Sequence, residues 1–279
     1  MKVLLTGKPG IGKSTILEKV KRSFIGPKFG IIGKEIRNQN RRVGFEAINH
    51  LGKRRTFAHT TDITSSNIVG GKYFVDLKVI NDFVIPEIEI GINGPDSLIF
   101  IDEIGRMQAL SNIFLQVVEK ILNSSSNVIA TIVFDPEPWS VEFKENKSIV
   151  LVAVSKKNRD LLPNLLETIF SHLSIFHKLS NAQQKLVVDL SRKYFVKEEF
   201  IQISKLFENA IPYLVNNHVG KIGSNKFKIK GNTNIHIVEK LTTGFICDCN
   251  LFNGSGQFAN NQGECSHIQT VKLLEVKAV

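Results

Sequence analysis

The chain is poor in the residue types that mark secreted and membrane-spanning proteins. Its 279 residues include three cysteines and one tryptophan, and no run of 18 consecutive apolar residues occurs. An odd number of cysteines argues against a disulfide framework, and the short apolar runs argue against a transmembrane helix. The apolar segment near the N-terminus, Val3 to Leu5, is too short for a signal peptide. We therefore expect a cytoplasmic protein with no membrane partner.

The overall composition is that of a soluble globular protein. Hydrophobic residues make up 42% and charged residues 22% of the chain. A chain of this length can bury a sizeable core and is long enough for two ordinary domains. We expect two domains.

Acidic residues are scarce in the first 60 residues, which contain 14 Lys/Arg against 3 Asp/Glu, whereas the remainder contains 22 against 23. Three interpretations stay open. The positive charge attracts a polyphosphate, binds nucleic acid through its backbone, or forms a solvated basic face without a ligand.

The segment GKPGIGKST follows the apolar residues Val3 to Leu5 and fits the phosphate-binding P-loop pattern without a mismatch. Its glycines allow a tight turn in which backbone N–H groups surround a phosphate. Lys13 is expected to contact the β- and γ-phosphates, and the hydroxyl of Ser14 to bind Mg²⁺. The predicted nucleotide-binding residues of this loop are Gly7, Lys8, Pro9, Gly10, Ile11, Gly12, Lys13, Ser14 and Thr15.

A second candidate site is the acidic pair Asp102 and Glu103, directly after the apolar run 98–101. A continuous apolar run of this length predicts a buried parallel strand. In a P-loop protein its acidic end is the Walker B position, where Asp102 would help to hold Mg²⁺ and Glu103 would act as general base for an attacking water. The alternative is that the pair caps the following helix.

Apolar periodicity predicts alternating strands and helices in the N-terminal part. Strands are expected over 29–36, 41–48, 98–101, 127–134 and 149–154, with a short one after the turn at 69–71. Helices are expected over 16–24 and 111–122. Residues 79–90 show a broken helical pattern around Pro86, and a loop is expected over 91–97. This order favours right-handed crossovers and a parallel sheet. Thr131, the polar member of its strand, either contacts the γ-phosphate or is an ordinary strand residue.

Several further segments occur in a characteristic order: Glu35-Ile36-Arg37, 42–45, 71–76, 102–107, Ala130-Thr131-Ile132 and Asn158-Arg159-Asp160. With the P-loop, they resemble the thermophile nucleoside triphosphatases, also called cancer-related nucleoside triphosphatases, over roughly residues 1–178. The resemblance implies an α/β, RecA-like P-loop domain with a mostly parallel sheet flanked by helices. It also implies hydrolysis of ATP, GTP and other nucleoside triphosphates to diphosphate and phosphate with Mg²⁺.

An arginine is expected beside the transferring phosphoryl group, because its guanidinium suits the charge spread over the phosphoryl oxygens. Arg37, Arg42 and Arg159 are the candidates, since they lie within the family-like segments. The chain departs from the family pattern at Gln108, where an acidic residue is usual, and at Val133, where a polar one is frequent. These departures are expected to affect substrate preference more than phosphate chemistry.

Residues 179–279 are expected to form a separate, small α+β domain. Residues 182–217 have helical periodicity, and 226–229 and 235–238 alternate as short strands with a turn at Gly231-Asn232. All three cysteines fall in the pattern Cys247-Asp248-Cys249, 15 residues, Cys265-Ser266-His267, which predicts a structural Zn²⁺ bound by Cys247, Cys249, Cys265 and His267. The alternative is a set of buried cysteines without a metal.

The zinc pattern, with a hairpin before it and the apolar tail 268–276 after it, resembles the SWIM zinc finger, which implies DNA, RNA or protein binding. The leading hypothesis is thus an Mg²⁺-dependent nucleoside triphosphatase with a zinc-binding accessory domain. A nucleic-acid-binding protein with a regulatory ATPase is the alternative. A P-loop nucleotide or nucleoside kinase is a third hypothesis, which requires an acceptor pocket.

Overall fold

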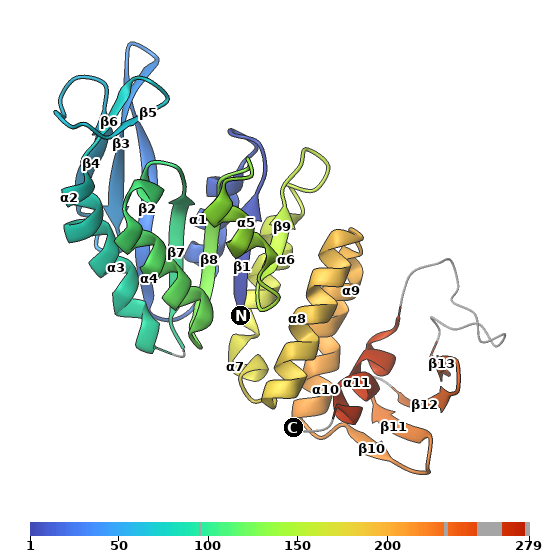
Figure 1. The fold of residues 1–279 in the computed structure, drawn as a ribbon. Helices are drawn as coiled ribbons and strands as arrows, with labels where there is room; N and C mark the ends of the chain where they lie inside the picture. Colours follow the sequence, from blue (N-terminus) through green and yellow to red (C-terminus); the bar gives the residue numbers. More distant parts are fainter. Residues whose placement is uncertain (95, 232–233, 250–263, 277–279) are drawn as a thin grey trace. The chain divides into compact units, whose positions relative to one another are not determined.

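The computed structural model describes residues 1–94, 96–231, 234–249 and 264–276 (Figure 1). The chain forms two compact units, Met1–Pro163 and Asn164–Val279. The sequence placed the boundary near Lys178, at the expected end of a family domain, and that boundary stays a prediction. Within the described residues, no helix is both long enough and apolar enough to cross a membrane.

The first unit contains a nine-stranded sheet in the order β5-β6-β4-β3-β2-β7-β8-β1-β9. The expected parallel sheet forms one half of it, because neighbouring strands in the order β2, β7, β8, β1 and β9 all pair in parallel. The strands are β1 (Lys2–Thr6), β2 (Lys28–Asn38), β3 (Arg41–Asn49), β4 (Arg54–His59), β5 (Ile68–Val69), β6 (Tyr73–Val75), β7 (Leu98–Ile104), β8 (Asn127–Ile132) and β9 (Val150–Ala153).

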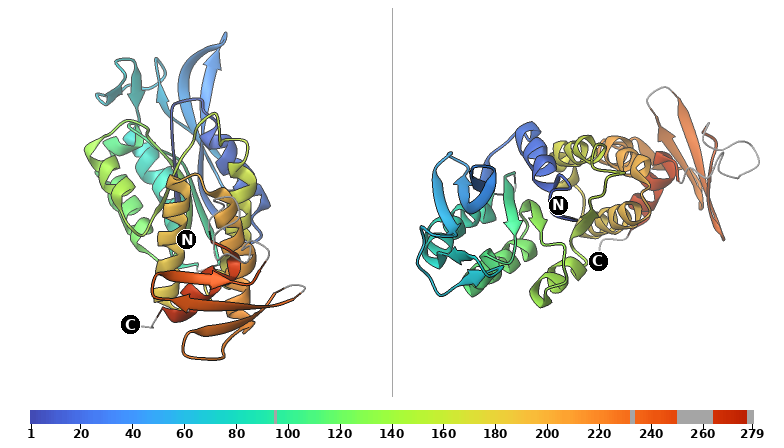
Figure 2. Two further views of the ribbon diagram at one scale, coloured as in Figure 1. Left: turned by 90° about the vertical axis from the view of Figure 1, so that its right-hand side faces the viewer. Right: turned by 90° about the horizontal axis from the view of Figure 1, so that it is seen from above.

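Helices cover both faces of the parallel half (Figures 1 and 2). Strand β7 shows why, because its side chains alternate between the faces. Phe100 lies under Lys21 of α1 (Lys13–Ser23), whereas Ile99 and Ile101 belong to the apolar cluster formed with α3 (Ile85–Glu89) and α4 (Asn112–Asn123). The part of β7 that helices cover on both faces, residues 98–101, is apolar throughout, as the sequence predicted.

Four strands, β3, β4, β6 and β5, extend the sheet in antiparallel fashion. The pairing of β2 with β7 ends at Ile32 and Asp102, but β2 continues to Asn38 against β3 alone. The β2–β3 hairpin therefore projects beyond the carboxyl ends of the parallel strands, where P-loop proteins bind their ligands.

The segment from Leu77 to Asn93 is one uninterrupted helical stretch, so the predicted loop over 91–97 begins later than expected. It consists of α2 (Leu77–Val79), a π-turn (Ile80–Val84), α3 and a 3-10 turn (Ile90–Asn93). Pro86 is the second residue of α3, just after the π-turn, whose wider spacing accommodates a residue that has no N–H to donate. The broken periodicity around Pro86 reflects this turn.

The second unit combines helices with a small antiparallel sheet in the order β10-β11-β12-β13. Its elements are α6 (Leu162–Ser171), which begins two residues before the boundary, α7 (Leu173–Phe176), α8 (Asn181–Val196), α9 (Phe200–Lys205), a π-turn (Leu206–Ala210), α10 (Ile211–Val215), α11 (Ser266–Glu275), β10 (Val219–Lys221), β11 (Lys226–Lys230), β12 (Ile235–Leu241) and β13 (Gly244–Cys247). Phe227, Ile229 and Val238 form an apolar core with the three cysteines. The predicted turn at Gly231-Asn232 lies partly outside the described residues.

Candidate active site

The P-loop connects β1 to α1 in the predicted way. Gly7, Gly10 and Gly12 all have positive φ angles, of 148°, 73° and 112°. A Cβ atom at Gly7 would also lie 2.6 Å from the carbonyl oxygen of Val154, so this position requires glycine. The Nζ of Lys13 donates to the carbonyl oxygen of Gly7 at 2.9 Å, which holds the ammonium group over the loop.

Asp102 is the centre of a cluster of oxygen atoms beside the loop. The hydroxyl groups of Ser14 and Thr131 both donate to its Oδ1, at 3.1 and 2.7 Å. The residue is only 4% exposed, and burial raises the pKa of its carboxyl group, while the two hydrogen bonds act against this rise. A buried carboxylate with neighbouring hydroxyl oxygens suits a hard divalent cation. The residues present therefore fit Mg²⁺, with Ser14 and Asp102 as the groups that would hold it.

Glu103 lies next to Asp102 within β7, which is three residues longer than the predicted strand 98–101. Adjacent strand residues normally point to opposite faces, but the pairing of β7 with β8 is interrupted between Ile101 and Ile104. This bulge allows both carboxylates to line one cavity. Burial raises the pKa of Glu103, the Lys13 ammonium acts against the rise and the Asp102 charge adds to it. A carboxylate with a raised pKa is suited to accept a proton.

The acidic pair does not cap the following helix. The N-cap of α4 is Ser111, whose Oγ accepts a hydrogen bond from the N–H of Phe114 at 3.2 Å. The alternative interpretation of Asp102 and Glu103 as capping residues is therefore wrong.

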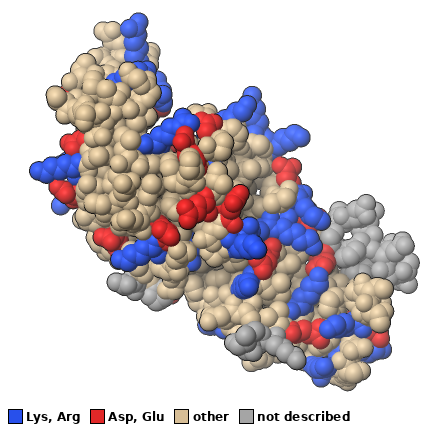
Figure 3. Space-filling model, viewed as in Figure 1, with Lys and Arg blue, Asp and Glu red and all other residues tan. Residues whose placement is uncertain are grey.

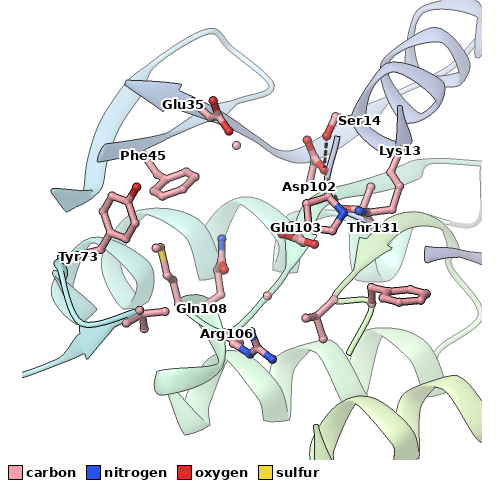
Figure 4. A pocket seen from close by; sticks show the side chains of 18 of the residues that line it. Lys13, Ser14, Glu35, Phe45, Tyr73, Asp102, Glu103, Arg106, Gln108 and Thr131 are labelled. Atoms are coloured by element: carbon pink, nitrogen blue, oxygen red, sulfur yellow. Dashed lines mark hydrogen bonds between the residues drawn. The ribbon is translucent and has the colours of Figure 1, made fainter. Parts of the chain in front are cut away.

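A cavity of about 440 Å³ joins these groups (Figure 4). Its walls come from the P-loop, from β7 and the segment after it, from the end of β8 and from the antiparallel strands. It is lined by Gly7, Pro9, Gly10, Lys13, Ser14, Gly33, Lys34, Glu35, Arg42, Phe45, Phe57, Val69, Gly70, Tyr73, Asp102, Glu103, Gly105, Arg106, Met107, Gln108, Thr131, Val133, Phe134 and Asp135.

Most predicted site residues meet at this cavity, but not all. Of the loop, Lys8, Ile11, Gly12 and Thr15 do not line it. Among the three candidate arginines only Arg42 lines it. Arg37 instead donates to Glu35 at 3.0 Å, and the Nε of Arg159 lies 3.8 Å from Asp160.

Arg42 is held firmly by its neighbours. It donates to Glu35 Oε1 at 2.8 Å and to the Tyr73 hydroxyl at 3.1 Å, and its guanidinium lies 5.2 Å from the ring centre of Phe45. Burial acts to raise the pKa of Glu35, but hydrogen bonds from Arg42 and Arg37 outweigh it, so this pKa lies below its usual value. Glu35 is therefore an anion at neutral pH.

The sequence analysis missed several residues of the cavity. Arg106 lines it and forms ion pairs with Asp135 at 2.9 Å and Glu137 at 2.6 Å. Arg106 stands in the segment 102–107, so its position beside the acidic pair was a usable signal. Phe45 and Tyr73 also lie in family-like segments, but only the sheet topology shows that they face the same cavity as Glu103.

Five of the 14 basic residues of the first 60 positions form ion pairs with the three acidic ones. Glu18 pairs with Arg22 and Lys34, Glu35 with Arg37 and Arg42, and Glu46 with Arg54. Figure 3 shows Lys and Arg gathered at the tip of the β2–β3 hairpin and in smaller groups elsewhere on this face, with Asp and Glu lying between these groups. The excess charge thus forms no continuous basic field on this face.

The four predicted zinc ligands are brought together in the second unit. Cys247, Cys249, Cys265 and His267 are all buried, and their ligand atoms lie within 4.8 Å of one another. Cys247 ends β13 and His267 lies in the first turn of α11. Zn²⁺ binds sulfur at about 2.3 Å and imidazole nitrogen at about 2.0 Å, so four such groups around one ion fit this spacing. The donor set therefore suits zinc.

Comparison with known proteins places the first unit in a family. A family model described as NTPase matches residues 2–167. The nucleoside-triphosphatase THEP1 of Thermotoga sp. (strain RQ2) is 38% identical over 164 residues, which are 59% of this chain and 92% of the relative. The human cancer-related nucleoside-triphosphatase is 30% identical, over 61% of this chain and 96% of the relative.

The fold is shared as well. The crystal structure of THEP1 from the hyperthermophile Aquifex aeolicus superimposes with a TM-score of 0.55 at 32% identity, covering 62% of this chain and 99% of that one. The predicted resemblance and the P-loop α/β fold are thereby confirmed for the N-terminal part, whereas the family model ends before the cysteine cluster. The match spans more than half of the sequence and includes the P-loop, Asp102 and Glu103, and the chain therefore belongs to the NTPase family.

Proposed function

We propose that the first unit hydrolyses nucleoside triphosphates to diphosphates and phosphate with Mg²⁺. The observation that carries this proposal is that Lys13, Ser14, Asp102 and Glu103 line a single cavity. These side chains supply a fixed cation, oxygen ligands for a metal and a general base, which are the parts that phosphoryl transfer to water needs. The names of the related nucleoside triphosphatases support the same activity.

Each side chain has a role that follows from its position. Lys13 stabilises charge on the β- and γ-phosphates, and Glu103 accepts the proton of the attacking water. Mg²⁺, held through Ser14 and Asp102, would neutralise charge on the same phosphate oxygens. Thr131 donates to Asp102 and keeps its carboxylate oriented toward Ser14. Of the three arginines predicted from the sequence, Arg42 is the candidate beside the transferring group, because it alone of the three lines the cavity.

Phosphate release from ATP, GTP, CTP and UTP tests the proposal. Each nucleotide is incubated with the full chain, once with Mg²⁺ and once with an excess of EDTA. We expect release from several nucleotides with Mg²⁺ and none with EDTA. No release from any of the four with Mg²⁺ would contradict the proposed hydrolysis.

For the second unit we propose one structural Zn²⁺ in a SWIM-type finger. The support is the buried Cys₃His arrangement, whose four protein ligands would leave no open position for chemistry. Metal analysis of the purified chain should give one equivalent of zinc. Less than half an equivalent, after purification without chelators, would count against it.

A nucleic-acid partner for this unit is supported by one further feature. Lys226, Lys228 and Lys230 are exposed on one face of β11, while Phe227 and Ile229 are buried on the other. A row of cations at this spacing suits the backbone of a single strand. Fluorescence anisotropy with single-stranded DNA and RNA should show binding that weakens steeply with salt. Binding that is indifferent to salt would point to a protein partner instead.

A further inference from the structure

The cavity continues past Glu103 to an aromatic end that hydrolysis does not require. We define the distal end by Phe45, Phe57, Tyr73, Met107 and Gln108, which all line the cavity. In Figure 4 Phe45 and Tyr73 lie on the opposite side of Glu103 from Lys13, with Gln108 between them and Glu103. An attacking water needs only Glu103. A cavity of about 440 Å³ is instead of the size that holds a small organic ligand.

The distal end lies where a phosphoryl acceptor would enter. The P-loop holds the leaving diphosphate, and attack on the γ-phosphorus comes from the side opposite to the leaving oxygen. Lys13 and Glu103 are the side chains that would contact the γ-phosphate, and in Figure 4 Glu103 lies between Lys13 and the distal end. A molecule at the distal end would therefore face the γ-phosphorus along the direction of attack.

The walls of the distal end suit a flat ring. The rings of Phe45 and Tyr73 meet edge to face with centroids 5.3 Å apart, and Phe57 adds a third ring 6.2 Å from Phe45. Arg42 bonds to Tyr73 and lies over Phe45, so the aromatic wall is held in place. Tyr73 and Phe57 are buried and support Phe45, whose ring is partly exposed and can stack with the ring of a ligand.

Gln108 is the polar group of this wall. It is only 6% exposed, and within the described part of the chain its side-chain amide has no hydrogen-bond partner. Figure 4 shows the side chain directed into the cavity. The amide is not among the buried polar atoms that lack a partner, so it reaches the solvent of the cavity, where a ligand can supply an acceptor and a donor in place of water. The amide of glutamine pairs in this way with the edge of a nucleic-acid base.

Gln108 and the carboxylate of Glu103 both lie close to Gly105. A Cβ atom at Gly105 would lie 3.2 Å from Gln108 Oε1 and also 3.2 Å from Glu103 Oε2. The two oxygens are therefore no further apart than the sum of these distances. One ligand can bond to the amide with its ring and still place a hydroxyl beside Glu103.

We propose that the distal end binds a nucleoside as phosphoryl acceptor, in addition to water. This inference rests on nucleotide binding at the P-loop as proposed above. The base stacks against the partly exposed ring of Phe45 and pairs with Gln108. The nucleoside hydroxyl oxygen bonds to the γ-phosphorus while the bond between this phosphorus and the β–γ bridging oxygen breaks. The hydroxyl proton passes to Glu103, and the products are a nucleoside monophosphate and ADP.

The experiment follows label from the γ-phosphate of ATP. The full chain is incubated with Mg²⁺, γ-labelled ATP and, in turn, adenosine, guanosine, cytidine, uridine and thymidine, and labelled phosphate is separated from labelled nucleoside monophosphate. The variant is Gln108→Leu, which keeps the size of the side chain and removes its amide. The matched control is Gln116→Leu, the same change at an exposed position of α4 outside the cavity.

We expect labelled monophosphate from at least one nucleoside. In Gln108→Leu the ratio of monophosphate to phosphate should fall about tenfold, the loss of one well-placed hydrogen-bonding group, and in Gln116→Leu it should stay unchanged. Labelled phosphate as the sole product with all five nucleosides overturns the proposal. An unchanged ratio in Gln108→Leu overturns the placement of the nucleoside at the distal end. A raised KM of Gln108→Leu for ATP in the absence of nucleoside also overturns it, because Gln108 would then contribute to ATP binding. Monophosphate formation without any hydrolysis would support this inference while contradicting the proposed triphosphatase.

Discussion

The two clusters of candidate metal ligands in this protein differ in the number of protein ligands that they offer and in their accessibility to solvent and substrate. In the first unit Ser14 and Asp102 offer two oxygen ligands at the wall of a cavity. In the second, three cysteines and His267 form a complete and buried set. An incomplete set leaves positions for water and phosphate oxygens, whereas a complete one leaves none. The comparison teaches that a metal can take part in chemistry in the first unit and stabilise the fold in the second.

The largest expected effect breaks the closed cluster. Cys265→Ser should remove zinc and with it local folding free energy on the order of 10 kcal/mol, because the ligands fold around the metal. Calorimetry should then show loss of the transition of the second unit, and metal analysis loss of zinc. Nucleoside triphosphate hydrolysis should stay near its original rate, and a loss of hydrolysis with the first unit still folded would show that the two clusters are not independent.

Next in size is the loss of the fixed cation at the open site. Lys13→Ala should lower kcat by about 10³-fold or more, since no other described side chain places a cation over the loop in the same way. Steady-state phosphate release measures the effect. Lys19→Ala, an exposed position of α1, is the control. Full activity in the Lys13 variant would refute the P-loop assignment.

The general base comes third. Glu103→Gln should lower kcat by about 10²-fold while nucleotide and Mg²⁺ still bind, because the amide keeps the shape and cannot accept the proton. Single-turnover hydrolysis, beside calorimetric binding of a non-hydrolysable ATP analogue, separates the two effects. A variant that hydrolyses at the normal rate would leave Glu103 without a catalytic role.

A smaller effect is expected for the arginine of the cavity wall. Arg42→Lys should lower kcat by about tenfold and affect affinity less, since an ammonium cannot replace the forked guanidinium. Arg37→Lys and Arg159→Lys serve as comparisons, because neither side chain lines the cavity. A larger kcat loss in either of them than in Arg42→Lys would contradict the assignment.

The smallest effect is a shift in pH dependence. Glu103 acts as a base only when it is deprotonated, and burial raises its pKa. Hydrolysis should therefore decline on acidification at a higher pH than the ordinary glutamate pKa of about 4.3 would give. A pH–rate profile of kcat/KM measures this acid limb, and the limb should be absent in Glu103→Gln. An acid limb that is unchanged in this variant would belong to another group.

Sequence analysis succeeded where function depends on neighbours along the chain. The P-loop is a nine-residue segment whose glycines adopt the positive φ angles that the loop requires, so its geometry depends on local sequence. The apolar run before Asp102 likewise predicts a buried strand from local sequence. The grouping of the four cysteine and histidine side chains was also predicted, because two short pairs, Cys247 with Cys249 and Cys265 with His267, carry their own spacing.

Sequence analysis failed where function depends on pairing between distant segments. The three arginines looked equivalent, and only the projection of the β2–β3 hairpin brings Arg42 to the cavity while Arg37 remains outside its lining. The bulge in β7, which turns Glu103 toward the same cavity as Asp102, depends on the register with β8. The position of Arg42 at the cavity and the bulge in β7 cannot be predicted from the periodicity of the sequence.

The sequence by itself thus determined the phosphate-binding loop, the acidic pair and the two short cysteine and histidine pairs of the second unit, because each is a property of a few consecutive residues. Only the tertiary structure decided that Phe45, Tyr73 and Gln108 form the far wall of the same cavity, since they come from three segments that meet through antiparallel pairing and the turn after β7. Contacts between segments far apart in the chain arise from packing of the whole sheet, and a local pattern cannot specify them.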